Sequence, residues 1–203
     1  MAVFSGSQRI PFWACFELYW IRVQLGEESF MSATDFKKLT LRKKRVYVET
    51  SIISYFTGLP SRNLLAAAWQ SLTVEWWKKR RKLFDVFASE LVLEEAGRGD
   101  PEAAKRRLSA LEGIPLLKLT DTAEKLSVKL LSEGAVPPKA ADDALHIALA
   151  AVHNIDYLLT WNCRHIDNAE NKPLVRSTIL AQGYACPEIC TPQELLGGDP
   201  DEK

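Results

Sequence analysis

The sequence has no excess of charge of either sign. Its 203 residues include 26 lysines and arginines and 26 aspartates and glutamates, so the formal net charge is zero. A neutral chain has no overall field that favours nucleic acid. Any contact with RNA or DNA must therefore use a local patch of basic side chains. The length is sufficient for one domain with a sizeable core plus an extension.

Cysteine is scarce, and its four positions are irregularly spaced. They are too few for a disulfide scaffold, which fits a reducing compartment, and we expect a cytoplasmic protein. A zinc site is one alternative use of Cys163, Cys186 and Cys190 together with His165. Neither the C-x-H nor the C-x-x-x-C spacing is that of a zinc knuckle, so we favour free thiols.

Long apolar runs and glycine-rich phosphate loops are also missing. The aromatic stretch at residues 10–25 is too short to span a bilayer, and Glu17 and Arg22 make it too charged. It also lacks the basic start and small-residue cleavage site of a secretory signal, so we expect no membrane partner. The chain contains neither G-x-G-x-x-G nor G-x-x-x-x-G-K, which argues against a dinucleotide or nucleoside triphosphate enzyme.

The sequence does contain a regular alternation of short apolar runs and longer amphipathic segments. We expect strands at residues 46–48, 83–88, 116–119, 157–160 and 189–190. Helices are expected after the first strand and at residues 64–82, 91–97, 101–111, 121–132 and 140–153. This alternation predicts βαβ units, and hence an α/β fold with a central, mainly parallel sheet of about five strands.

The alternation also suggests the domain boundaries. We assign residues 45–196 to one domain, residues 1–44 to an N-terminal extension and residues 197–203 to a mobile tail. The extension has two interpretations. It is either an appended segment, disordered or packed on the domain or a partner, or upstream sequence that is not native, with Met31 as the true start. We favour the second, because a self-sufficient domain begins at about residue 45.

Acid or amide side chains occur at the ends of several expected elements. Glu49 follows the first strand, Glu95 lies on the helix after the second, Asp143 opens the alanine-rich helix and Asn162 follows the fourth strand. In a parallel sheet these places meet at one rim. Clustered carboxylates repel each other unless a cation neutralises them. Oxygen ligands select hard cations, so the expected cofactor is Mg²⁺ or Mn²⁺.

Some of these acids have neighbours that could take their place. Glu94 and Glu95 point about 100° apart on a helix, as do Asp142 and Asp143, and the residues alone leave both choices open. Nearby hydroxyl and imidazole groups could hold a metal or a phosphate, or could serve as ordinary caps and hydrogen-bonding groups. These are Thr50, Ser51, Thr160, His165 and His146, and for His146 we favour a structural role.

Four segments carry a resemblance to a known family: VYVETSIISY, SELVLEEA, DDALHIALA and LLTWN, in that order. Together they resemble the PIN domain, the fold of the VapC-like toxin ribonucleases. The resemblance covers about residues 45–196 and implies a three-layer α/β/α sandwich.

Position by position, the resemblance implies a catalytic set of Glu49, Glu95, Asp143 and Asn162, with the first three binding metal. It selects Glu95 over Glu94 and Asp143 over Asp142, leaving Asp142 in a supporting role. Two positions depart from the family pattern. Glu49 stands where aspartate is usual, and Asn162 replaces a fourth acid. We therefore expect one strong metal and a weak second one.

The resemblance implies a divalent-metal-dependent endoribonuclease that hydrolyses RNA phosphodiester bonds and acts as the toxin of a type II toxin–antitoxin pair. The implied partners are an RNA substrate, a cognate antitoxin protein and a second copy of the chain. The alternative, favoured by the neutral Asn162, is a catalytically weak or inactive PIN domain used as an RNA-binding or protein-interaction module. The basic and aromatic cluster at residues 76–82 could grip RNA, or could be a solvated helix end that buries its tryptophans.

Overall fold

The computed structural model describes residues 42–197. The aromatic stretch at residues 10–25, the alternative start at Met31 and nearly all of the expected extension and tail lie outside these residues. None of the described helices is both long and apolar enough to cross a membrane.

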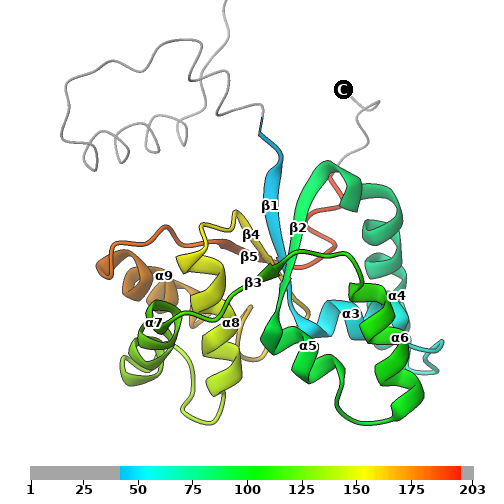
Figure 1. Cartoon of the computed structure of the whole chain (residues 1–203), viewed down its shortest axis with the longest axis horizontal. Helices are drawn as coiled ribbons and strands as arrows, with labels where there is room; N and C mark the ends of the chain where they lie inside the picture. Colours follow the sequence, from blue (N-terminus) through cyan, green and yellow to red (C-terminus); the bar gives the residue numbers. More distant parts are fainter. Residues whose placement is uncertain (1–41, 198–203) are drawn as a thin grey trace, which may run out of the picture. The chain divides into compact units, whose positions relative to one another are not determined.

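A sheet of five parallel strands forms the centre of the domain. Its spatial order is β3-β2-β1-β4-β5, so the chain starts in the middle of the sheet and extends it to both sides (Figure 1). This confirms the α/β fold class expected from the alternation. The strands are β1 (Lys44–Val48), β2 (Phe84–Ser89), β3 (Leu116–Leu117), β4 (Tyr157–Leu159) and β5 (Glu188–Cys190).

Seven α-helices of the described chain cover the two faces of this sheet. Helices α3 to α6 pack among themselves on one side, and α7, α8 and α9 gather on the other (Figure 1). The result is a three-layer α/β/α sandwich. The helices are α3 (Thr50–Thr57), α4 (Leu64–Glu75), α5 (Glu90–Ala96), α6 (Pro101–Leu111), α7 (Asp121–Ser132), α8 (Ala141–Val152) and α9 (Lys172–Ala181).

The central position of β1 explains why its residues are buried. Val46, Tyr47 and Val48 are fully buried, because strands pair with both edges of β1 and helices cover both of its faces. An apolar, β-branched run without polar alternation is typical of such a strand. The next residue, Glu49, is therefore carried to the carboxyl rim of the sheet.

Two parts of the chain differ from the expected elements. The long helix expected over residues 64–82 stops being α-helical at Glu75 and continues as a π-helical turn, Trp76–Arg80, and a 3-10 turn, Arg81–Leu83. Helix α9 was not expected at all. Pro173 lies in its first turn, a common start signal, but no side chain caps the helix and it is only ten residues long.

The helix starts near the sheet follow ordinary capping rules with one correction. Ser89 caps α5, accepting a hydrogen bond from the Val92 backbone N–H at 3.2 Å. We expected Thr50 or Ser51 to cap α3, and this was wrong. Glu49 is the cap, because its longer side chain folds back to accept the Ser51 backbone N–H at 3.0 Å.

Candidate functional site

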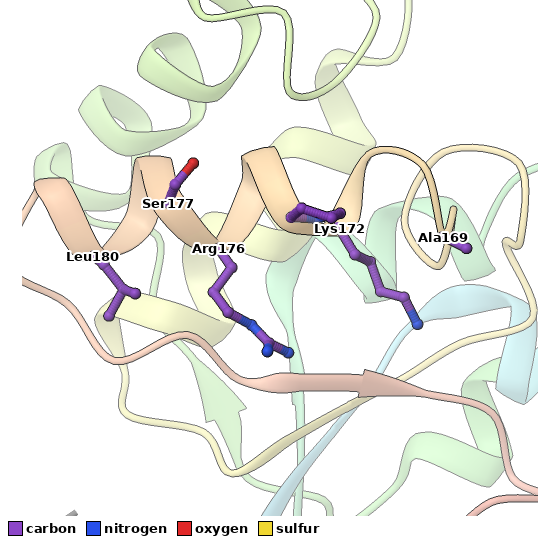
Figure 2. Close-up of a pocket in the computed structure, with 6 residues that line it drawn as sticks. Ala169, Lys172, Arg176, Ser177 and Leu180 are labelled. Atoms are coloured by element: carbon purple, nitrogen blue, oxygen red, sulfur yellow. The ribbon is translucent and has the colours of Figure 1, made fainter. Parts of the chain in front are cut away.

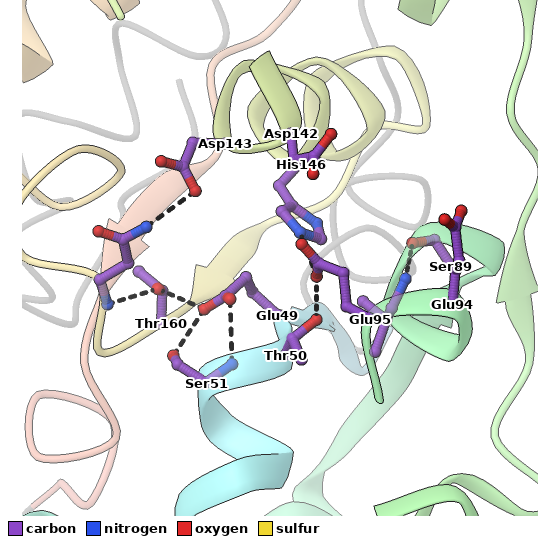
Figure 3. Close-up of polar contacts among 12 residues, drawn as sticks. Glu49, Thr50, Ser51, Ser89, Glu94, Glu95, Asp142, Asp143, His146 and Thr160 are labelled. Carbon is purple, nitrogen blue, oxygen red and sulfur yellow. Dashed lines mark hydrogen bonds and ion pairs between the residues drawn. The ribbon is translucent and has the colours of Figure 1, made fainter. Parts of the chain in front are cut away.

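Glu49 is held at the carboxyl rim by three neutral donors. Its Oε1 accepts the Ser51 backbone N–H, and its Oε2 accepts the Ser51 hydroxyl at 2.6 Å and the Thr160 hydroxyl at 2.7 Å. Thr160 follows β4, the neighbour of β1, so parallel pairing places both residues at the same rim. Figure 3 shows this group at the start of α3. The carboxylate is buried, and none of these three donors carries a positive charge.

Glu95 reaches the same space from α5. Its Oε2 accepts hydrogen bonds from the Thr50 hydroxyl and from His146 Nε2, the latter at 3.0 Å. Glu94 turns away (Figure 3), is 66% exposed and pairs with Arg98 at 2.5 Å. Adjacent helical residues diverge by about 100°, and in this helix it is Glu95 that faces the sheet rim.

His146 is part of a buried chain of hydrogen bonds that sequence reasoning missed. Its side chain is 1% exposed, and its Nδ1 lies 2.7 Å from the Tyr47 hydroxyl. That hydroxyl in turn lies 2.7 Å from the hydroxyl of Ser89. His146 Nε2 donates to Glu95 in both protonation states. When His146 is neutral, its Nδ1 accepts from Tyr47, which accepts from Ser89; when His146 is protonated, Nδ1 donates to the Tyr47 oxygen and Tyr47 donates to Ser89. The chain fixes the orientation of the Glu95 carboxylate.

The electrostatics of this chain couple Glu95 to His146. Burial lowers the pKa of His146, but the hydrogen bond to Glu95 and the charges of Glu49, Glu95 and Asp143 outweigh it, so this pKa is raised. Burial raises the pKa of Glu95, but the His146 hydrogen bond and charge, with help from Thr50 and Arg98, leave it lowered. Burial raises the pKa of Tyr47, which keeps the phenol neutral. The pair therefore favours ionised Glu95 beside protonated His146.

Three potential metal ligands converge at this point. Ligand atoms of Glu49, Glu95 and His146 all lie within 4.8 Å of one another. Two carboxylates and one imidazole suit a divalent cation, and the imidazole favours Mn²⁺ over Mg²⁺ if His146 binds directly. The donor set therefore fits the metal that the family resemblance implies.

Asp143 lies at the start of α8 in a separate group of polar contacts. Its Oδ1 accepts the Asn162 side-chain amide at 2.9 Å, and its Oδ2 lies 2.8 Å from His165 Nδ1. The Asn162 carbonyl oxygen accepts the His165 backbone N–H at 3.2 Å. Asn162 thus orients Asp143 and His165. Asp143 itself does not belong to the tight ligand group of Glu49, Glu95 and His146.

Asp142, the neighbour of Asp143, points toward solvent instead. Its side chain is mostly exposed, and its Oδ2 lies 3.9 Å from Arg98, which also pairs with Glu94. Figure 3 shows Asp142 and Asp143 pointing in different directions from α8. The two acids with exposed partners, Asp142 and Glu94, are therefore the ones turned away from the rim.

The alternative zinc ligands are not gathered in the structure. Among residues 42–197, the group of close metal-ligand atoms contains none of Cys163, Cys186, Cys190 and His165. The three cysteines are free thiols, and burial raises the pKa of Cys186 to about 11.

Comparison of the chain with protein-family models, with curated proteins and with solved structures found no match in any of the three. The basis for a function is therefore the arrangement of Glu49, Glu95, His146 and Asp143.

Proposed function

We propose that the protein is a PIN-like, divalent-metal-dependent endoribonuclease and the toxin of a type II toxin–antitoxin pair. The observation that carries the proposal is the convergence of Glu49, Glu95 and His146 within 4.8 Å at the carboxyl rim of a parallel sheet. Ligands and substrates of open α/β sheets bind at that rim. The four sequence segments that resemble PIN domains contribute the residues at this rim.

Charge supports a cation at this place. Two carboxylates approach each other, and the hydrogen-bond donors that hold Glu49 are neutral. The guanidinium of Arg98 acts on Glu95 only as a minor influence, since it is exposed and paired with Glu94. His146 can neutralise one negative charge when protonated. A divalent cation would remove the remaining repulsion and release the His146 proton.

Each residue then has a stated role. Glu49 and Glu95 would hold Mg²⁺ or Mn²⁺, and His146 would either orient Glu95 or supply a nitrogen ligand. Asp143 would add a third carboxylate, with Asn162 and His165 holding it in place. When bound, the cation supplies a Lewis acid that polarises a phosphodiester.

The structure changes what we expect of Asn162. The family resemblance places Asn162 in the catalytic set, at the position of a fourth acid. Its side-chain carbonyl oxygen already accepts the His165 backbone N–H, while the amide nitrogen donates to Asp143. In this arrangement Asn162 acts on the metal through Asp143, and the site depends on three carboxylates.

The alternative function, an inactive binding domain, is supported by the hydrogen bonds that the site carboxylates already make within the chain. Both oxygens of Asp143 and both oxygens of Glu49 accept hydrogen bonds from the chain's own groups. Such a network can be stable without metal, as expected for an inactive PIN domain that binds RNA or protein. The active enzyme remains our first choice, because inactivity would not require two carboxylates and a histidine to converge.

The test is RNA cleavage by the full chain in Mg²⁺ or Mn²⁺, with EDTA as the metal-free condition. Asp143→Asn should lose activity by more than about tenfold, since a position that binds the metal changes the barrier by well over 1 kcal/mol. Asp142→Asn is the matched control, because it removes the same charge from the neighbouring, exposed position. Cleavage that persists in EDTA, or is equal in the two variants, would refute the metal mechanism.

The partners follow from the same proposal. A toxin of this class is held inactive by an antitoxin protein that occupies the groove beside the carboxylates, and we propose such a protein and a homodimer for this chain. Co-expression with the product of the adjacent reading frame should suppress the cleavage activity. If co-expression leaves the activity unchanged, that product is not the antitoxin.

A further inference from the structure

A second polar surface lies at the amino ends of the strands, opposite the carboxyl rim that holds the carboxylates. A pocket of about 400 Å³ is lined by Lys43, Trp77, Lys78, Arg81, Lys82 and Phe84, together called the basic pocket. Lys43 precedes β1, and Phe84 begins β2, so the pocket lies at the amino ends of these parallel strands. Glu49 follows the carboxyl end of β1. At about 3.3 Å per residue, the five residues of β1 separate the two surfaces by roughly 16 Å.

The basic pocket has four cations and no internal counter-charge. Within residues 42–197, none of its lysines or its arginine forms an ion pair with a carboxylate. Lys43 instead donates to the backbone carbonyl of Lys82 at 3.1 Å. Four like charges around one hollow raise its potential and attract an anion.

A pocket on α9 shows the contrasting case. Its lining also includes cations, Lys172 and Arg176, which lie among small and apolar residues (Figure 2). Lys172 pairs with Asp167 at 2.6 Å, and Arg176 pairs with Glu188 at 3.1 Å. The chain therefore neutralises the cations of that pocket with its own acids. The basic pocket lacks this neutralisation and is the better anion site.

Aromatic stacking holds the arginine of the basic pocket in place. The Arg81 guanidinium lies 4.7 Å from the centre of the Trp77 ring, and the Phe56 ring stacks on Trp77 at 4.6 Å. The Trp77 indole is therefore already in contact with a guanidinium and a phenyl ring. A guanidinium fixed on an aromatic ring loses less freedom when it binds phosphate. The pocket is therefore suited to backbone phosphates.

We infer that the basic pocket binds the sugar–phosphate backbone of a single RNA strand. Lys43 and residues 78–82 contribute the four cations from two segments, and the successive phosphates of a strand can contact charges spread over both. The chain as a whole is neutral, so this local patch must supply the electrostatic affinity. The choice of RNA rests on the proposed function, and the pocket would hold part of the substrate away from the cleavage site.

The experiment measures binding without cleavage. The full chain is titrated into a fluorescent single-stranded RNA of about 20 nucleotides in EDTA, and anisotropy is followed as salt is raised. Lys78→Ala/Lys82→Ala removes two exposed charges and leaves the stacked Arg81 in place. The matched control is Lys105→Ala/Lys125→Ala, which removes two exposed charges from α6 and α7.

The pocket variant should bind RNA about 10–30-fold more weakly near 0.1 M salt, because each phosphate contact contributes about 0.7 to the salt dependence of single-strand binding. Its slope of log affinity against log salt should become shallower by about 1.4. The control variant should match the parent protein. Equal binding by the pocket and control variants would overturn the inference, as would tighter competition by polyglutamate than by unlabelled RNA.

A cleavage assay on the same proteins separates this inference from the proposed function. If the nuclease proposal fails, the parent protein will not cleave RNA with added Mn²⁺, yet RNA binding will still depend on Lys78 and Lys82. If the inference fails, the parent protein will cleave RNA while the pocket and control variants bind it equally well.

Discussion

Replacing His146 tests the buried chain that orients Glu95. The substitution His146→Gln keeps a polar side chain of similar size but removes the ability to carry a positive charge. The imidazole is buried and contacts both the Tyr47 hydroxyl and the Glu95 carboxylate. Removing one partner of a buried ion pair costs about 3–5 kcal/mol, and an amide that recovers one hydrogen bond returns about 1 kcal/mol. We expect a loss of about 2–4 kcal/mol in the free energy of unfolding.

The loss in the free energy of unfolding should depend on pH, because both members of the pair titrate. The pKa of His146 is raised above its ordinary value of 6.5, so its contribution is complete below that pH and is lost as pH rises through the raised pKa. The pKa of Glu95 is lowered below 4.5, so its contribution is complete above that pH and is lost as pH falls through the lowered pKa. The pair is therefore most stabilising between about pH 4.5 and 6.5.

The assay is urea unfolding in EDTA, for the parent protein and for His146→Gln, near pH 5.5 and near pH 9. The difference should be about 2–4 kcal/mol at the lower pH and should shrink toward about 1 kcal/mol at the higher pH, where neutral His146 is only a hydrogen-bonding group. His153→Gln is the control, because the imidazole of His153 is partly exposed just past the end of α8 and contacts the Lys118 carbonyl instead of a carboxylate. A difference that is unchanged or larger near pH 9, or equal in the control, would refute the charge coupling.

Three further perturbations address the carboxylate rim and the domain boundary. Thr160→Val removes the buried hydroxyl that donates to Glu49, and urea unfolding should show a loss of about 1–3 kcal/mol; no loss would mean that Glu49 does not depend on this donor. Asn162→Asp places a second carboxylate against Asp143, so the melting temperature should fall in EDTA and respond more strongly to Mn²⁺ than in the parent; the opposite pattern would contradict the contact. Deletion of residues 1–41 should leave a folded domain with a melting temperature within a few degrees of the full chain, because β1 begins after them, and aggregation would show that they belong to the core.

The sheet could be predicted from local sequence because its signals are local. The apolar run before Glu49 and the alternation of strands and helices required only residue type and spacing. Helix α9 was missed because it lacks a side-chain cap, and its register depends on burial of Val175 and Ile179 against the rest of the core. The end of α4 was missed because the change to a π-helical turn at Trp76 leaves no signature in spacing.

In the candidate site, too, some features follow from local sequence and others arise only from tertiary packing. Parallel strands place Glu49 and Thr160 at one rim, which the strand-end rule anticipates. The choice of Glu95 over Glu94 needed the alignment of SELVLEEA with the family it resembles, because helix geometry alone leaves both glutamates possible. The partnership of His146 with Tyr47 could not be predicted, because the two residues are 99 positions apart and meet only through tertiary packing. The contact between Asn162 and Asp143 is equally non-local.

The most direct test of the proposed enzyme compares two neighbouring glutamates. Glu95 lies among the potential metal ligands, whereas Glu94 is exposed and paired with Arg98. RNA cleavage by Glu95→Gln and Glu94→Gln, measured against Mn²⁺ concentration, compares the loss of the same charge at adjacent positions. Our account predicts that Glu94→Gln cleaves like the parent protein and that Glu95→Gln is at least about tenfold slower at every Mn²⁺ concentration. Equal cleavage by the two variants, or cleavage by the parent protein without metal, would contradict it.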